Sequence, residues 1–199
     1  PYTVWPDGCL SAGLSRSDDG RGPALVVCVG PRVTALQPPV QAQRQLWGVR
    51  FWPDVAQAVF GAPARSLREH VGLAPASVAN FFTGIGDAIP ATRDTDVGLA
   101  ALDAFLVPRL QGKPQPDAQV RAAVSAIVRA RGEMAMPEVA AASGMSLRQL
   151  QRRFPEATGL TLREWARVRR LREALAARLT LAPAGWSRIA AEVGFVDHA

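Results

Sequence analysis

Residues 139–145 read "VAAASGM", and residues 189–195 read "IAAEVGF", which repeats the same pattern 50 positions further along the chain. The two copies match in character at five of their seven positions. In each copy an alanine is followed four residues later by a glycine. This spacing suits two helices that cross closely at a small side chain and are joined by a turn in which glycine takes the left-handed conformation. The repeat therefore predicts two helix-turn-helix units.

The first copy is complete, because Leu150 follows Gly144 at the spacing that pins the second helix onto the first. In the second copy the matching residue would fall at position 200, one beyond Ala199. We therefore expect one whole motif and the opening half of another. The chain opens on Pro1 rather than methionine, which suggests that residues are missing there as well.

The composition favours a globular protein. Of 199 residues 48% are hydrophobic, enough to bury a core in one large or two small domains. No run approaches the eighteen or so apolar residues of a membrane helix, and the start lacks a signal-peptide pattern, so we expect no membrane partner. Two cysteines, Cys9 and Cys28, are few for a disulfide scaffold and are expected to be reduced thiols in a cytoplasmic protein.

The net charge of +6 is unevenly distributed. Residues 1–115 carry 10 Lys and Arg against 9 Asp and Glu, whereas residues 116–199 carry 13 against 8, and all 13 are arginine. A basic half joined to a nearly neutral half suggests that a polyanion-binding domain is attached to another domain. GC-rich coding would also produce such arginine-rich composition.

Short β-prone runs separated by Gly and Pro fill the first quarter of the chain, which predicts a small antiparallel barrel or sandwich. The expected strands are Tyr2–Trp5, Cys9–Ser15, Ala24–Val29, Arg32–Leu36 and Gln45–Trp52. Helices are expected to follow at Pro53–Phe60, Ala64–Val71, Ala74–Phe82 and Thr95–Leu110.

The polar, proline-containing residues 111–117 predict a linker, and everything after them is expected to be helical. Asp117 and Ser146 are predicted helix caps, and Thr161 with Glu164 has the spacing of a capping box. Pro155 is expected to shorten its helix, so that the helix ends nearer Phe154. The domain division is therefore 1–110, the linker 111–117, and 118–199.

These residues resemble the DNA-binding domain of the AraC/XylS family of bacterial transcription regulators. The likeness covers roughly residues 117–199 and rests on Ser146, Leu150, Phe154, Thr158-Gly159, the "RLxxA" of Arg170, Leu171 and Ala174, and "IAxxxGFxD" at Ile189–Asp197. In that family a second recognition helix follows "GFxD". This sequence stops before that helix, so the second subdomain is not expected to read DNA.

The N-terminal half resembles, more loosely, a partial cupin-like barrel found ahead of some members of the family. "PDGC" at Pro6–Cys9 and "GVRFWPDVAQAVFGAPARSLRE" at Gly48–Glu69 carry that likeness. The resemblance implies an α+β protein with a sensing or dimerising domain of small antiparallel β-barrel or sandwich type. An all-α double helix-turn-helix, truncated in its second unit, would follow. It also implies double-stranded DNA, a small-molecule effector, a second copy of the chain and RNA polymerase as partners.

The helix beginning at Leu147 is expected to lie in the major groove of DNA. Its face opposite Leu150 and Phe154 presents arginine and glutamine, the side chains suited to guanine and adenine edges. The predicted base-reading residues are Arg148, Gln149, Gln151 and Arg152. The predicted phosphate contacts are Ser146, Arg153, Thr161 and Arg163.

An enzyme is disfavoured. The only histidines, His70 and His198, lie in different domains, whereas a metal site needs three or four ligands, so neither a metal nor a cofactor is expected. Aromatic side chains of the N-terminal half could line an effector pocket or simply pack in its core. These are Trp5, Trp47, Phe51 and Trp52. The expected function is a DNA-binding regulator. The alternative is a protein-interaction or dimerisation module with a vestigial DNA-binding domain.

Overall fold

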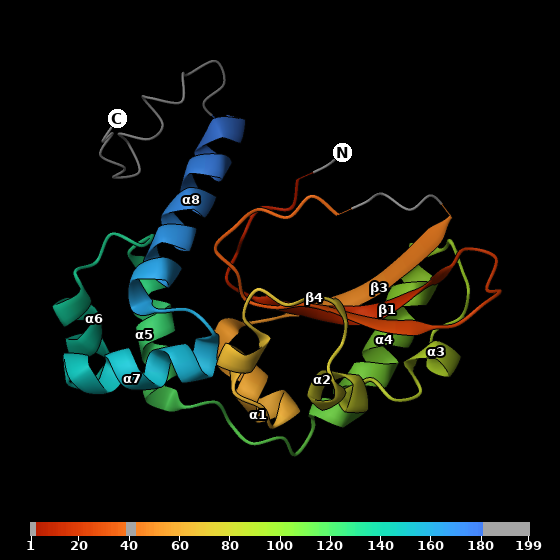
Figure 1. Ribbon diagram of the computed structural model, residues 1–199, viewed down its shortest axis with the longest axis horizontal. Helices are drawn as coiled ribbons and strands as arrows, with labels where there is room; N and C mark the ends of the chain where they lie inside the picture. The colour runs from red at the N-terminus through yellow and green to blue at the C-terminus, as the bar shows by residue number, and fades with distance from the viewer. Residues whose placement is uncertain (1–2, 39–42, 181–199) are drawn as a thin grey trace.

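The computed structural model describes residues 3–38 and 43–180 of the chain (Figure 1). A sheet and its covering helices are followed by four further helices. The elements are β1 (Leu10–Ser17), β2 (Leu25–Val29), β3 (Arg44–Phe51), η1 (Pro53–Val55), α1 (Ala56–Phe60), η2 (Ala64–Leu67), β4 (Val71–Leu73), α2 (Ala76–Phe81), α3 (Ile85–Ala88), α4 (Thr95–Leu110), α5 (Ala118–Arg129), α6 (Met136–Ser143), α7 (Leu147–Thr158) and α8 (Leu162–Thr180). Among the helices in these ranges, none is long and apolar enough to cross a membrane.

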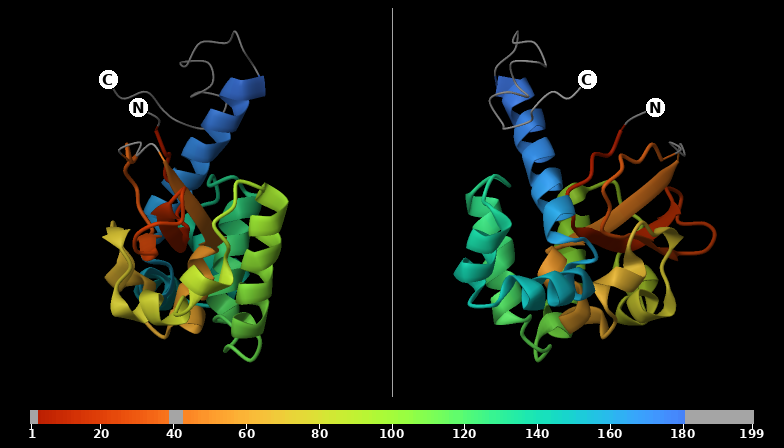
Figure 2. Two further views of the ribbon diagram at one scale, coloured as in Figure 1. Left: turned by 90° about the vertical axis from the view of Figure 1, so that its right-hand side faces the viewer. Right: turned by 60° about the vertical axis from the view of Figure 1, so that its left-hand side comes forward.

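The sheet is antiparallel, with strand order β3-β1-β2-β4. Its two faces differ because side chains alternate along each strand. On β1, Leu10, Ala12 and Leu14 are buried and point toward the helices. Arg16 continues this buried row, and its guanidinium donates to the carbonyl oxygens of Gly86 and Ile89. Helices α1 to α4 cover this face of the sheet, as Figures 1 and 2 show.

The sheet does not close into the expected barrel or sandwich. Arg32–Leu36 and the N-terminal segment form no strand in the described residues, and Val4 and Leu36 make only one isolated antiparallel bridge. The fourth strand is instead β4, whose first residue, Val71, was expected to end a helix over Ala64–Val71; that helix is replaced by the short η2 and the strand. The chain reaches β4 through the short η2 turn, and β4 then pairs with β2. The sheet keeps one face free of the described helices.

The helix-turn-helix predicted from the first copy of the repeat is confirmed. Helices α6 and α7 are joined by Gly144 in the left-handed conformation, with φ 68°. Ala140 and Leu150 are both buried where the two helices meet. Asp117 caps α5 by accepting from the backbone N–H groups of Gln119 and Val120, as expected. The second copy of the repeat lies outside the described residues.

Helix α7 extends past Pro155 to Thr158, so the expected shortening is wrong. Proline removes the hydrogen bond that would reach the carbonyl of Gln151, but Gln151 lies on the exposed side of the helix, where water can satisfy that carbonyl. Beyond the proline the Gly159 N–H donates to the Pro155 carbonyl at 2.9 Å. The last turn of α7 therefore forms although residue 155 has no backbone N–H to donate.

Two hydrophobic cores stabilise the molecule. One is built from residues 10–106, between the sheet and α1 to α4. The other is built from residues 120–168, with Trp165, Phe154 and Leu160 almost fully buried, and Val33 of the N-terminal half packs against it. The two cores are therefore held against each other by side chains as well as by the intervening linker.

Candidate nucleic-acid interface

Helix α7 presents a polar, basic surface on the side that faces away from its core. Leu150 and Phe154 are fully buried, whereas Gln151 and Arg152 between them are exposed. All four predicted base-reading residues are exposed: Arg148, Gln149, Gln151 and Arg152. Arg148 and Arg152 lie one helical turn apart, on the same face. An exposed helix of about three turns with this face has the shape that the major groove of DNA admits.

Three of these side chains share one surface hollow with Ser146. The hollow is lined by Ser146, Arg148, Gln149 and Arg152, with a volume of about 520 Å³. Gln151 does not line it. Within the part of the chain that the structure describes, no hydrogen bond or ion pair engages the guanidinium of Arg148 or Arg152. Both can therefore approach a ligand without breaking an internal contact.

Ser146 and Gln149 are partly committed to capping α7. The Ser146 hydroxyl accepts from the Gln149 backbone N–H at 3.3 Å, and the Gln149 side-chain oxygen accepts from Ser146. This reciprocal arrangement is a capping box. The cap uses the side-chain oxygen of Gln149, so the amide NH₂ group remains available to donate hydrogen bonds to a ligand.

Thr161 has a similar capping role at the start of α8. Its backbone N–H and hydroxyl both donate to Glu164 at 2.9 Å. The predicted capping box is thus present. The predicted phosphate contact at Thr161 would have to come from backbone N–H groups at the start of α8, which attract anions.

Arg153 is directed toward the start of α5 and remains partly exposed. Its guanidinium forms an ion pair with Asp117 and donates to the side-chain oxygen of Gln119 at 2.7 Å. Burial opposes ionisation of Asp117, but hydrogen bonds from Val120 and Arg153 outweigh it and hold the pKa of this carboxyl below its usual range. Arg153 therefore ties α7 to the start of α5.

Arg163 lies on a different hollow from that of α7. It lines a depression of about 420 Å³ together with Arg167, Arg170 and residues 132–136 of the turn between α5 and α6. Arg163 and Arg167 are exposed. The side chains that were predicted to contact DNA are thus distributed over two separate surfaces and one partly exposed ion pair.

The four aromatic residues of the predicted effector pocket are not brought together. Phe51 is buried in a phenylalanine cluster, with its ring centroid 5.0 Å from that of Phe60. Trp47 faces α4, where a side chain on Gly98 would overlap its ring. Trp52 is 53% exposed and lines a depression beside α5, whereas Trp5 is 44% exposed on the N-terminal segment. Phe51 and Trp47 therefore pack in the core of the N-terminal half, which is the alternative to the effector pocket.

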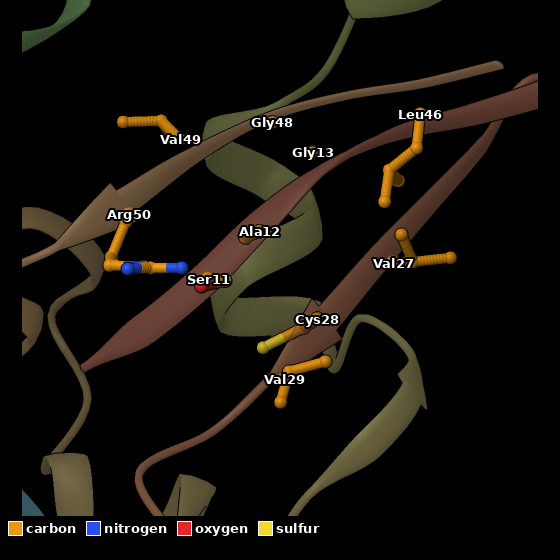
Figure 3. A pocket seen from close by; sticks show the side chains of 10 residues that line it. All are labelled: Ser11, Ala12, Gly13, Val27, Cys28, Val29, Leu46, Gly48, Val49 and Arg50. Atoms are coloured by element: carbon orange, nitrogen blue, oxygen red, sulfur yellow. The ribbon is translucent and has the colours of Figure 1, made fainter. Parts of the chain in front are cut away.

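A hollow of about 320 Å³ lies elsewhere, on the helix-free face of the sheet (Figure 3). Gly13 and Gly48 are directly opposed across β1 and β3 and line this trough without any side chain of their own. Val27 and Leu46 flank the trough, and Ser11 and Arg50 lie toward one end. Arg50 is held there by an ion pair with Asp7 at 3.0 Å. We refer to this surface as the sheet-face trough.

The sheet-face trough was not predicted from the sequence, although the sequence of β2 contains a signal for it. Strand β2 reads "LVVCV", which is apolar at every position instead of alternating. Such a run predicts a strand that is covered on both faces. Here one face is covered by helices, and the other presents Val27 and Val29 to the trough.

Neither cysteine is in a disulfide. Burial, reinforced by the nearby Asp7 carboxylate, raises the pKa of the Cys9 thiol to about 12. Burial alone raises that of Cys28 to about 11. Both are therefore protonated thiols at neutral pH, and within the described residues no group of His, Cys, Asp and Glu could hold a metal ion.

Comparison with known proteins bears on the C-terminal half. Residues 139–199 match the model of a helix-turn-helix domain family, beginning in α6 and continuing through α7 and α8. The match supports an AraC-type DNA-binding domain, and with it a DNA-binding transcription regulator. This family is a regulatory domain family and not an enzymatic one. No curated protein and no solved structure matches the chain.

Proposed function

We propose that this protein is a sequence-specific transcription regulator that reads duplex DNA with α7 and responds to a small molecule through its N-terminal half. The observation that carries the proposal is the exposed face of α7, where Arg148 and Arg152 stand on a complete, well-capped helix-turn-helix. Arginine donates two hydrogen bonds to guanine, and glutamine pairs similarly with adenine. Base readout is therefore assigned to Arg148, Gln149, Gln151 and Arg152.

Phosphate contacts are assigned to the exposed arginines of α8, on the second hollow, and to the first turns of α7 and α8. Arg163 and Arg167 are the side chains that are best placed by exposure. The backbone N–H groups at the starts of α7 and α8, near Ser146 and Thr161, would add neutral donors. Arg153 is left out of the set, because its guanidinium is already engaged by Asp117 and Gln119.

The experiment is selection of bound duplexes from a random pool with the 199-residue chain, followed by measurement of the affinity at a series of salt concentrations. Enrichment of a short motif is expected. The logarithm of the affinity should fall with that of the salt concentration with a slope of about −0.9 per phosphate neutralised. A pool that stays random, with a flat salt dependence, would favour the interaction-module alternative.

For the effector, the sheet-face trough is the site that we propose in place of the four aromatic residues. Its lining is mainly apolar, with Ser11 and Arg50 as the polar groups, so it suits a small apolar molecule that carries an acidic or hydrogen-bonding end. Anilinonaphthalene sulfonate has this chemistry and serves as the probe. Val27→Asp should weaken its binding, whereas Leu179→Asp, on the 85% exposed end of α8, should not.

A further inference from the structure

The segment that runs from η2 through β4 contacts both halves of the molecule. Its first part, η2, packs against α7. Its last part, β4, is the edge strand of the sheet, where Val71 and Leu73 pair with Val29 and Val27 of the sheet-face trough. Only a few residues separate the two contacts. We call residues 64–73 the connecting segment.

Two arginines of the connecting segment hold the turn between α7 and α8. Arg68 donates through both terminal nitrogens to both oxygens of Glu164, at 2.9 and 2.7 Å. Arg65 donates to Glu156, near the end of α7, at 2.8 Å. The two-pronged geometry of the Arg68 pair restricts orientation as well as distance. The side chains of Arg68 and Glu164 are about one-third exposed, whereas the Arg65 pair is largely in solvent and is expected to contribute less.

The backbone of the connecting segment approaches the same turn. A side chain on Gly159, the residue between α7 and α8, would lie 2.9 Å from the Ala64 carbonyl oxygen and 2.9 Å from the Pro31 ring. This turn therefore sits directly against the N-terminal half, without room for a side chain. A shift of the connecting segment would push on the end of α7.

The other end of the segment is fixed to the sheet. The Gly30 N–H donates to the His70 carbonyl at 2.9 Å, and the Ala74 N–H donates to the Val26 carbonyl at 2.9 Å. Glu69 accepts from the Val33 N–H at 2.9 Å and pairs with Arg32 at 3.3 Å. These contacts make the segment a stiff connection rather than a loose loop.

We propose that the connecting segment couples the sheet-face trough to the recognition helix, with Arg68 as the residue that positions the turn between α7 and α8. The inference rests on the proposed function. It adds that the N-terminal half sets the orientation of α7 through a defined contact and that Arg68 acts on DNA binding without touching DNA.

The test is a double-mutant cycle on the intact protein. Arg68→Ala removes both hydrogen bonds. Glu164→Gln keeps a side-chain oxygen that can accept from Thr161 but removes the negative charge of the ion pair with Arg68. The third variant combines the two substitutions. The matched control is Arg93→Ala. This variant loses the same charge from an ion pair with Asp18, within the N-terminal half.

Two readouts separate the coupling from the DNA-binding function. Hydrogen exchange without DNA should quicken in Arg68→Ala at both residues 158–165 and residues 70–74. Affinity for DNA selected by the wild-type protein should fall about 2- to 30-fold, the usual range for residues that modulate coupling. The double variant should bind no more weakly than the weaker single variant, and Arg93→Ala should match the wild type in both measurements.

Exchange that quickens only at residues 158–165 would overturn the coupling to the sheet. Faster exchange with an affinity no lower than that of Arg93→Ala would overturn the positioning role of Arg68. A wild-type protein that selects no DNA would overturn the proposed function. The exchange pattern would then still show whether the two halves are coupled.

Discussion

The side chains of Arg148 and Arg152 are exposed, whereas those of their neighbours Gln149 and Arg153 form hydrogen bonds within the protein. Gln149 accepts a hydrogen bond from Ser146, and Arg153 forms an ion pair with Asp117. Arg148 and Arg152 are thus the arginines of α7 that are left to contact bases. Arg148→Ala and Arg152→Ala should each relax sequence preference at one base pair, at a cost of about 1–3 kcal/mol. Arg163→Ala should weaken binding to all sequences alike, because phosphates are the same in every sequence. Selection repeated with each variant checks this, and an unchanged motif in both Arg148 and Arg152 variants would remove them from the readout surface.

Gly8 shows how one residue joins the two halves. Its φ is +72°, and a side chain there would overlap the ring of Trp165, which is buried in α8. Gly8→Ala should lower the free energy of unfolding by about 2–4 kcal/mol, from left-handed strain and overpacking together. Gly61→Ala is the control. Gly61 has φ +69° but no atom within 4 Å, so strain of about 1–2 kcal/mol alone should remain. Urea unfolding measures both, and equal losses would show that the Trp165 contact contributes nothing.

Helix α7 carries its recognition face despite an internal proline. Pro155 leaves the Gln151 carbonyl without a helical donor, so Pro155→Ala should restore one hydrogen bond and raise the melting temperature by a few degrees. Pro137→Ala is the comparison, because Pro137 lies in the first turn of α6, where proline is favourable. No gain is expected there. A lower melting temperature for Pro155→Ala would mean that the proline ring contributes packing that outweighs the missing bond.

The contact between the two halves should make stability depend on pH. The hydrogen bonds from Arg68, followed by those from Thr161, lower the pKa of Glu164 from 4.5 to about 2 although burial opposes this. Because the folded pKa lies below the unfolded one, the contribution is complete above about pH 4.5 and is lost as pH falls toward 2. Thermal unfolding at steps from pH 5 to 2 should therefore decline less steeply in Glu164→Gln and in Arg68→Ala than in the wild type. Arg93→Ala should decline as the wild type does, and parallel profiles for all four proteins would show that the pair makes no pH-dependent contribution.

The helices of the C-terminal half could be predicted because their determinants are local. Asp117, Ser146 and Gly144 act on backbone groups within four residues, and the apolar spacing around Leu150 follows the helical period. The matching of residues 139–199 to a helix-turn-helix family rests on the same local pattern. The base-reading surface could be predicted to the extent that helical geometry dictates which side chains face away from the core.

The sheet and the contact between the halves depend on residues far apart in the chain. Whether a short β-prone run such as Arg32–Leu36 pairs depends on which strand edge is free, and here β4 takes the edge of β2. Arg68 and Glu164 are separated by 96 positions, so no spacing rule relates them. Periodicity and capping thus determined which segments of the C-terminal half are helices and which motif they form. Long-range packing determined that the sheet stays open and that α7 packs against the N-terminal half. Such contacts join residues far apart in the chain, so they depend on the tertiary structure and not on the local sequence.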